Sequence, residues 1–526
     1  MKETTATLGD VQPDLAKPNT EHHEFLGYED PHRAALEDNP EHAEKLTLSV
    51  ALSALFLGTS FTGPIIFGFI LVTPILVQLG QKLGGATITF WIPSGWGAAA
   101  AVGFSIAGRL SDIFGTISVA YAGLSEILPN KYRGIGLAWT EFNLSSWAVP
   151  GTLLANAMLS NASWRIIFPP SHPRPDDKTK WQQFRELDFI GAFLFVAGLA
   201  VFLFGLNSGG SQYPWKSGAT LAPLILGLFA FLGAFAYDFA VPKDPLFPWY
   251  LFKDFREFSA LPILVFVAGM VFFAASALNA QTILYLYTAD PIKIGLYSLP
   301  SGAAQLIGGV FVPALVSYIK HVNYQLIAAV FMQTLFFGLA ATITPNNINW
   351  LMACQFLAMF AFGWITLNCY TTASLNVPQK DLGVAIGLIG TFRSVGGSVG
   401  TVIFSSIFTQ VAAKHVAAGV SKAALEGGVS AASIGELIEA VELTLVGVPG
   451  AAANLTDVPA SIFEACIDAA RLGYAYGFRM TWIASIPFGI IAILCAIAVR
   501  DCSTYFTNHV EVRLNEKVGG KYEGNE

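Results

Sequence analysis

Charged side chains are scarce in this sequence. Asp, Glu, Lys and Arg make up 12% of its 526 residues, whereas a soluble globular chain carries about 25%. Hydrophobic residues account for 54%, and the mean hydropathy is +0.55. Much of the protein surface must therefore face a solvent other than water, and we predict an all-α integral membrane protein.

Other absences narrow the class of function. The five cysteines are scattered and lack metal-ligand spacing, so we expect neither a disulfide framework nor a metal site. The sequence has no basic stripe for nucleic acid and no G-x-x-x-x-G-K-[ST] loop for ATP. The polar, acidic start indicates no cleavable signal peptide. Gly396-Gly-Ser-Val-Gly400 matches the G-x-S-x-G elbow of hydrolases, but it lies in an apolar segment without a preceding strand. We predict close helix packing there and no enzyme.

Long apolar segments follow one another along the chain. A bilayer core needs roughly 20 apolar residues per helix. Eleven segments are long enough, and a twelfth at 117–128 is too short. The eleven cover residues 46–77, 90–107, 135–159, 189–206, 219–240, 258–285, 295–318, 322–344, 350–370, 383–412 and 480–499.

Basic loops, which mark the cytoplasmic side, alternate with these segments from residue 189 onward and place the C-terminus in the cytosol. The glycosylation sequons at Asn161 and Asn454 fall on the opposite side, as glycosylation requires. We expect a long extracellular loop at 413–476 with amphipathic helices; a disordered loop is the alternative.

Several motifs carry a family resemblance. Gly108-Arg-Leu-Ser-Asp-Ile-Phe-Gly115, which contains Arg109 and Asp112, resembles the G-x-L-x-D-x-x-G gating loop of the major facilitator superfamily. Glu126-Ile-Leu-Pro-Asn-Lys-Tyr-Arg-Gly134, with Arg133, resembles its E-x-x-P-x-x-x-R-G loop. Residues 388–400 and 287–291 are similar to the fourteen-span drug:H⁺ antiporters of fungi, nearest to the branch of trichothecene efflux pumps and siderophore-iron transporters.

This resemblance implies two pseudo-symmetric helical bundles with the substrate site between them. An internal echo supports two halves, because P-x-K-x-x-G occurs at both 129–134 and 378–383. The resemblance also implies that about three family spans, the third, most of the fourth and the sixth, are missing between residues 116 and 188. Asp112 would act as a gating latch, although the basic residues expected after Gly115 are absent.

The predicted organisation has eight parts, in chain order. They are an acidic, disordered cytosolic tail (1–45), an incomplete N-terminal bundle (46–168), a basic, Pro-rich cytosolic loop (169–188), two extra linker spans (189–257), a C-terminal bundle (258–412), the extracellular loop (413–476), the last span (477–500) and a cytosolic tail (501–526).

Ionisable residues within a bilayer are costly and mark candidate functional sites. Arg393 lies ten residues into its segment, about 15 Å from the cytoplasmic end, and is our candidate for substrate or proton coupling; structural pairing is the alternative. Glu141 is the candidate proton carrier, because burial raises a carboxyl pKa. Glu126 and Arg133 are expected to pair across their loop. Polar residues that can line a pathway, or simply bond between helices, are Asn143, Asn279, Gln281, Gln305 and Asn368.

The predicted function is secondary transport of a hydrophobic organic compound, such as a drug or mycotoxin, by proton-coupled alternating access. No cofactor is expected, since the proton gradient supplies the energy. Two alternatives stay open: a ferric-siderophore transporter, and a truncated membrane protein that no longer transports. The expected partners are the lipid bilayer and a small organic substrate, without nucleic acid. We expect a monomer in the plasma membrane, with a vacuolar or endosomal membrane as the alternative.

Overall fold

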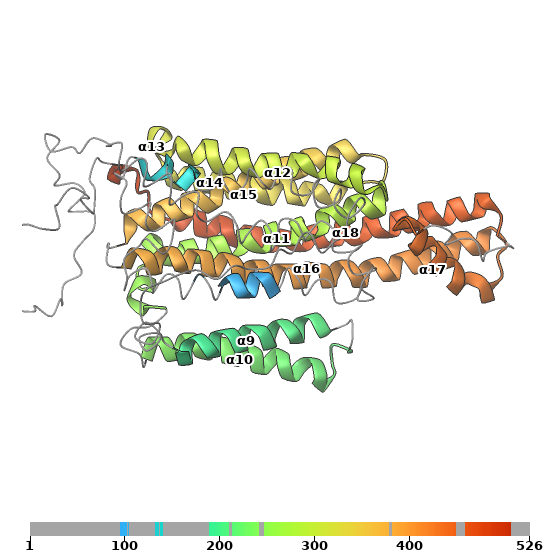
Figure 1. Ribbon diagram of the computed structural model, residues 1–526, viewed down its shortest axis with the longest axis horizontal. Coiled ribbons are helices and arrows are strands. Elements are labelled where there is room, and N and C mark those ends of the chain that lie inside the picture. The colour runs from blue at the N-terminus through green and yellow to red at the C-terminus, as the bar shows by residue number, and fades with distance from the viewer. Residues whose placement is uncertain are drawn as a thin grey trace, which may run out of the picture.

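The computed structural model describes residues 95–101, 104, 132–135, 137–139, 189–209, 213–240, 247–377, 381–448 and 458–506. Helices dominate this part of the chain (Figure 1). The α-helices are α9 (Phe189–Ser208), α10 (Gly218–Ala240), α11 (Ala260–Leu286), α12 (Pro291–Ala314), α13 (Val316–Ile319), α14 (Val322–Leu339), α15 (Ile348–Asn376), α16 (Leu382–Glu426), α17 (Ile434–Leu445) and α18 (Ala460–Ala498). Short 3₁₀ turns lie at Trp249–Phe252, Ala340–Thr342, Ala431–Ser433 and Ser503–Tyr505, and a π-helical turn at Phe255–Ser259.

Six helical segments in the described residues are long and apolar enough to cross a bilayer, and they include α10, α11, α14, α15, α16 and α18. Helices α9 and α12 also occupy predicted spans. Within α9 the apolar stretch is short, Phe193–Leu206, and α12 contains Pro300 and Pro313. These helices confirm the predicted all-α membrane protein.

Helix α11 is the centre of the C-terminal bundle. It packs against α15, α16 and α18, and nearly all of its side chains are buried. A helix with apolar side chains on every face must be shielded from water on every face, by neighbouring helices or by lipid. Helices α12, α14 and α15 complete this bundle, while α9 and α10 form a separate antiparallel hairpin beside it (Figure 1).

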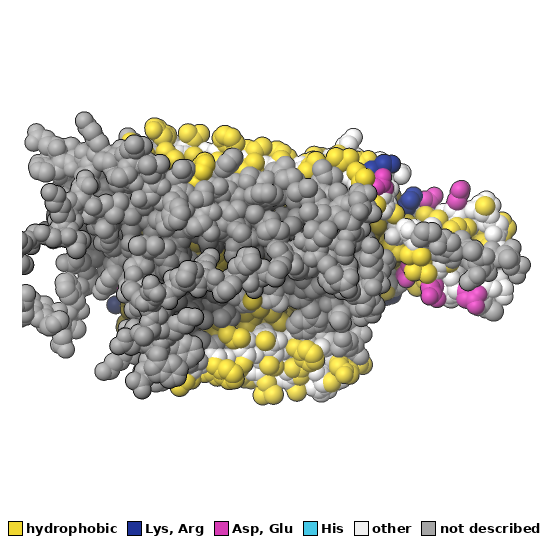
Figure 2. Space-filling model, in the orientation of Figure 1, with side chains coloured by type: hydrophobic (Ala, Val, Ile, Leu, Met, Phe, Trp, Pro, Cys, Tyr) yellow, Lys and Arg dark blue, Asp and Glu magenta, His cyan; other side chains and the backbone are white. Residues whose placement is uncertain are grey.

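Helices α16 and α18 extend well past the rest of the bundle (Figure 1). The apolar segment predicted to end at 412 continues as one helix to Glu426, and the last span begins at Ala460 within the predicted loop. Packing explains the difference, because Val416 and Val420 of this extension are buried. Charged side chains gather over the extension in Figure 2, whereas hydrophobic ones cover α12 and the α9–α10 hairpin.

Two helix ends in the extension are fixed by glycine. Gly428 has φ +82° and follows α16, where the Val429 amide bonds to the Ala424 carbonyl at 2.9 Å. Gly447 has φ +81° and ends α17 in the same way, with Val448 bonded to Leu443. These are Schellman caps, which need a residue without a Cβ at the left-handed position.

Candidate functional site

The candidate site lies on α16 at Arg393, a charged residue that is only 7% exposed. Its guanidinium carbon lies 5.9 Å from the centre of the Phe104 ring. Phe104 belongs to the predicted N-terminal bundle and Arg393 to the C-terminal bundle. An arginine stays charged at any physiological pH, so this contact places a permanent charge where the two halves meet.

Further contacts extend this seam along α16. The Thr391 hydroxyl lies 3.2 Å from the Ala101 carbonyl oxygen and shares its one proton with the closer Gly387 carbonyl of its own helix. The ring centres of Trp96 and of Phe273 on α11 are 6.1 Å apart. Gly97 and Gly390 leave room for close approach: a Cβ on Gly97 would lie 2.4 Å from the Ser398 hydroxyl, and one on Gly390 would lie 2.5 Å from the Phe104 ring. Residues 95–101 and Phe104 therefore form a close-packed boundary with α16.

Helix α16 is held tightly on its other side by α11. A Cβ on Gly396 would lie 2.1 Å from the Phe266 carbonyl oxygen, and one on Gly400 would lie 2.4 Å from that of Met270. Small residues let helix backbones approach closely in a bilayer. This packing accounts for the G-x-S-x-G match without a hydrolase site, and it holds the part of α16 that carries Arg393 against α11.

The predicted polar residues fall into separate places. The Asn279 amide on α11 donates to the Ser301 hydroxyl on α12 at 3.3 Å, while Gln281 bonds to the Ala277 carbonyl of its own helix. Gln305 is partly buried on α12, where its carbonyl lies close to Gly363 of α15. The side-chain oxygen Oδ1 of Asn279 is buried and has no hydrogen-bond partner in the structure.

Asn368 belongs to a different cluster. Its amide and the Trp364 indole both donate to the Gln325 side-chain oxygen at 3.2 Å. Gln325 in turn donates to the Lys320 carbonyl at 2.8 Å. Lys320 and His321 have φ of 56° and 50°, so this amide cluster holds a turn in a conformation that non-glycine residues seldom adopt. The geometry suits a structural tie between α14 and α15.

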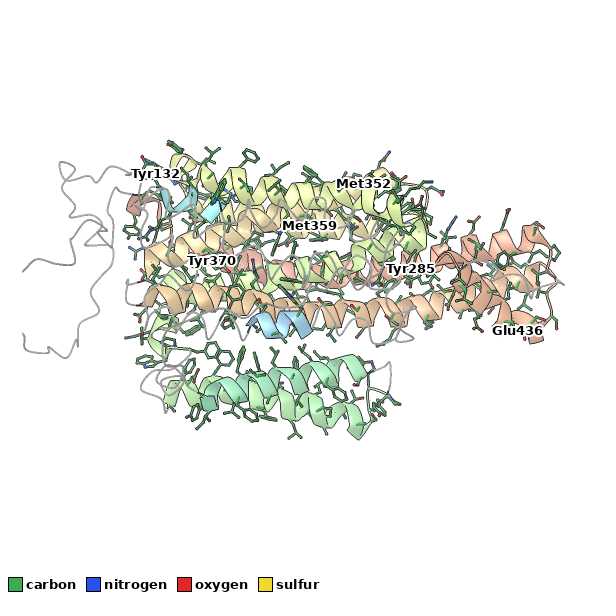
Figure 3. The ribbon with its side chains drawn as sticks, in the orientation of Figure 1. Tyr132, Tyr285, Met352, Met359, Tyr370 and Glu436 are labelled. Carbon is green, nitrogen blue, oxygen red and sulfur yellow. The ribbon has the colours of Figure 1, made fainter. Side chains whose placement is uncertain are left out.

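Arg133 also contacts the opposite half. Its Nη1 donates to the Ser374 carbonyl near the end of α15 at 2.7 Å, and a Cβ on Gly134 would lie 2.5 Å from the Pro313 carbonyl of α12. Tyr132, the neighbour of Arg133, marks this end of the bundle in Figure 3, opposite Glu436 on α17. The predicted pair with Glu126 lies outside the described residues.

The same end of the bundle carries a clasp between the π-helical turn that precedes α11 and the residues that follow α18. Arg500 forms an ion pair with Glu257, and its amide donates to the Arg256 carbonyl at 2.9 Å. Beside it, the Cys502 thiol is fully buried and contacts the Thr372 hydroxyl at 3.8 Å. Burial raises the pKa of Cys502 to about 12, so this thiol stays protonated.

Several other predicted positions lie outside the described residues. They are Glu141, Asn143, Gly108, Arg109, Asp112, Gly115, Asn161 and Asn454, together with most of the region in which family spans are predicted to be missing.

Gln325 was not among the predicted polar residues, although an amide side chain within an apolar segment would have identified it. The bond from the Tyr250 hydroxyl to Asp381 at 2.6 Å has no local signal, because 131 residues separate the partners.

A bundle whose helices are long and apolar enough to cross a bilayer defines an integral membrane protein. Comparison with known proteins makes this specific: the fungal trichothecene efflux pump (TRI12) family matches residues 163–522, more than half of the chain. The chain belongs to this family, which confirms the predicted superfamily and a transporter rather than an enzyme.

Individual relatives agree. The MFS-type transporter prx5 of Penicillium rubens is 29% identical over 77% of each chain. The trichothecene efflux pump TRI12 of Fusarium sporotrichioides is 23% identical over 75% of this chain and 70% of its own. Among solved structures, a bacterial homologue of the human lysosomal transporter Spinster is 14% identical, with a TM-score of 0.40 over 87% of this chain and 97% of that one.

Proposed function

We propose that this chain exports a hydrophobic organic compound, with trichothecenes as the first substrate class to test, by proton-coupled alternating access. The observation that carries the proposal is Arg393, a buried charge on α16 that contacts Phe104 at the boundary with residues 95–101. Membership of an efflux-pump family and the names of the relatives supply the substrate class.

The physical reason is the cost of a buried cation. In a dry seam the guanidinium needs the Phe104 ring and other close groups, because desolvating a charge is expensive. Opening the seam would exchange these contacts for water, substrate or an ionised carboxylate. The preference of Arg393 for each of these environments would then bias the equilibrium between the closed and open seams. Glu141 remains our proposed proton carrier.

The test uses the purified full chain in proteoliposomes with an acidic interior and a trichothecene outside. Efflux of protons should drive accumulation of the toxin, and dissipating the pH gradient should abolish it. In Arg393→Lys we expect flux to fall at least tenfold, because lysine lacks the planar group that stacks on an aromatic ring. Arg479→Lys, at an exposed position on α18, is the matched control and should keep its flux.

Accumulation that ignores the pH gradient would refute proton coupling, and an active Arg393→Lys would remove Arg393 from the mechanism. Uptake of a ferric siderophore by the same vesicles, without toxin transport, would favour the siderophore alternative. No flux of either compound would favour a chain that no longer transports.

A further inference from the structure

A cavity of about 340 Å³ separates the α9–α10 hairpin from α11 and α16. Seven phenylalanines line it, among them Phe195 and Phe235 from the hairpin and Phe266 and Phe392 from the bundle, and no lining residue is charged. We infer that this cavity holds one acyl chain of a phospholipid drawn from the surrounding bilayer.

The hydrogen-bonding state of the walls favours hydrocarbon. Ser259 and Thr391 are the hydroxyl-bearing residues that line the cavity. The Ser259 hydroxyl donates to the Phe252 carbonyl at 2.7 Å, and that of Thr391 donates to the Gly387 carbonyl at 2.9 Å. A polar ligand would lose its hydrogen bonds to water and find no donor here. A buried water molecule needs about two to four polar partners, and the walls of this cavity do not offer them.

The position of the cavity indicates that its occupant comes from the bilayer. Phe193 of α9 and Phe229 of α10 are each 71% exposed, so the outer face of the hairpin faces lipid. Leu232 lines the cavity and is itself 53% exposed, which makes the cavity continuous with that lipid-facing surface. An empty space there would forfeit dispersion contacts with the surrounding rings, and lipid hydrocarbon is the nearest material that restores them.

Charge at one end of the cavity suits a phospholipid head group. Phe252 lines the cavity, and the exposed Lys253 follows it directly. Of the other charged residues in this turn, Glu257 is paired with Arg500, Arg256 donates through Nε to the Ala498 carbonyl, and Asp254 is exposed. A lipid whose chain enters at this end would place its phosphate near Lys253.

The test is photo-crosslinking with a phosphatidylcholine that carries a diazirine on one acyl chain. The full chain is reconstituted with this lipid, extracted and washed in detergent to remove loosely bound lipid, and then irradiated. Mass spectrometry of the peptides should find the label on residues 259–266 and 391–395, on both walls of the cavity.

Two variants on α10 make the test specific. Leu232→Trp places a larger side chain at the cavity and should reduce the label several-fold. Leu226→Trp makes the same change at a residue that is 65% exposed and does not line the cavity, and should leave the label unchanged.

Absence of label in the washed wild-type protein would overturn the inference, as would equal labelling in both variants. Displacement of the label by a transported toxin would overturn it too, because the cavity would then be a substrate site. This outcome is independent of proton coupling, so the inference and the proposed function can fail separately.

Discussion

Glycine sets the distance between α11 and α16. Gly396 and Gly400 are one helical turn apart and point at carbonyl oxygens of α11. Adding even a methyl group there forces the two backbones apart, since a helix backbone cannot yield as a flexible side chain can. At the scale of single residues, this contact holds the helix that carries Arg393.

We therefore expect Gly396→Ala to destabilise the protein by about 1–3 kcal/mol, the usual cost of overpacking. The measurement is the thermal unfolding temperature of the purified protein in detergent. Gly233→Ala on α10 is the control, because a Cβ there meets nothing within 4 Å. An unchanged unfolding temperature in Gly396→Ala would mean that the helices separate at little cost.

Among the predicted site residues, the charged ones carried the clearest signal in the sequence, and the role of Arg393 stays a prediction. Arg393 stood out because an arginine within an apolar segment is rare, and the structure places it buried at the seam. The amides were harder to assign: the same signal marked Asn279, which bonds between helices, and Gln281, which bonds within its own helix. Sequence reveals that an amide lies in an apolar helix, but its partner depends on how the helices are rotated.

At the scale of elements, the clasp between the turn that precedes α11 and the residues that follow α18 closes one end of the bundle. Glu257 and Arg500 form its ion pair, and Asp501 accepts from the Val322 amide at the start of α14. Cys502 lies buried in the same place. Since a thiol reacts as its thiolate, this cysteine reports whether the clasp is closed.

We expect Cys502 to resist N-ethylmaleimide at pH 7.5 in the wild-type protein, because its pKa is raised to about 12 by burial. Glu257→Gln removes the ion pair and should increase labelling of Cys502 several-fold, as measured by mass spectrometry of its peptide. Asp468→Asn, which breaks the exposed Asp468–Arg471 pair on α18, is the control. Fast labelling of the wild-type protein would show that the clasp is not closed in solution.

The apolar segments predicted where helices lie, but not the full lengths of α16 and α18. Apolar segments of bilayer length located α10 and α11 to within two residues at each end, because lipid demands apolar length. Helix α15 continues beyond its predicted end at 370 to Asn376. The rest of α16 beyond 412 is stabilised by tertiary packing instead. Val416, Val420 and Ala424 recur every four residues on a buried face, and α16 packs against α18. This packing partner cannot be identified from the local sequence, which is why the region was predicted as a loop with amphipathic helices.

At the scale of the whole molecule, two contacts join the halves at different depths. Arg393 meets Phe104 within the bundle, and Arg133 bonds to the Ser374 carbonyl at one end. In alternating access one end of the seam opens while the other closes. The bond of Arg133 is therefore expected to break each time its end opens.

This expectation can be tested by access to position 374. Ser374 is buried, so a Ser374→Cys protein should react slowly with a charged maleimide. Adding Arg133→Met removes the bond and should increase the labelling rate several-fold, while Arg479→Met in the same background should not. Equal rates in both would show that Arg133 does not hold this end closed.

The length of α16 has a mechanical consequence. Its 45 residues span about 67 Å, more than twice the roughly 30 Å of a bilayer core. If α16 tilts by about 10° around Arg393, its inner end moves by about 3 Å, whereas the tip at Glu426 moves by about 9 Å. A small tilt of α16 therefore displaces the tip of the extension about three times as far as the inner end of the helix. A fluorophore attached at the tip would report this tilt of the helix.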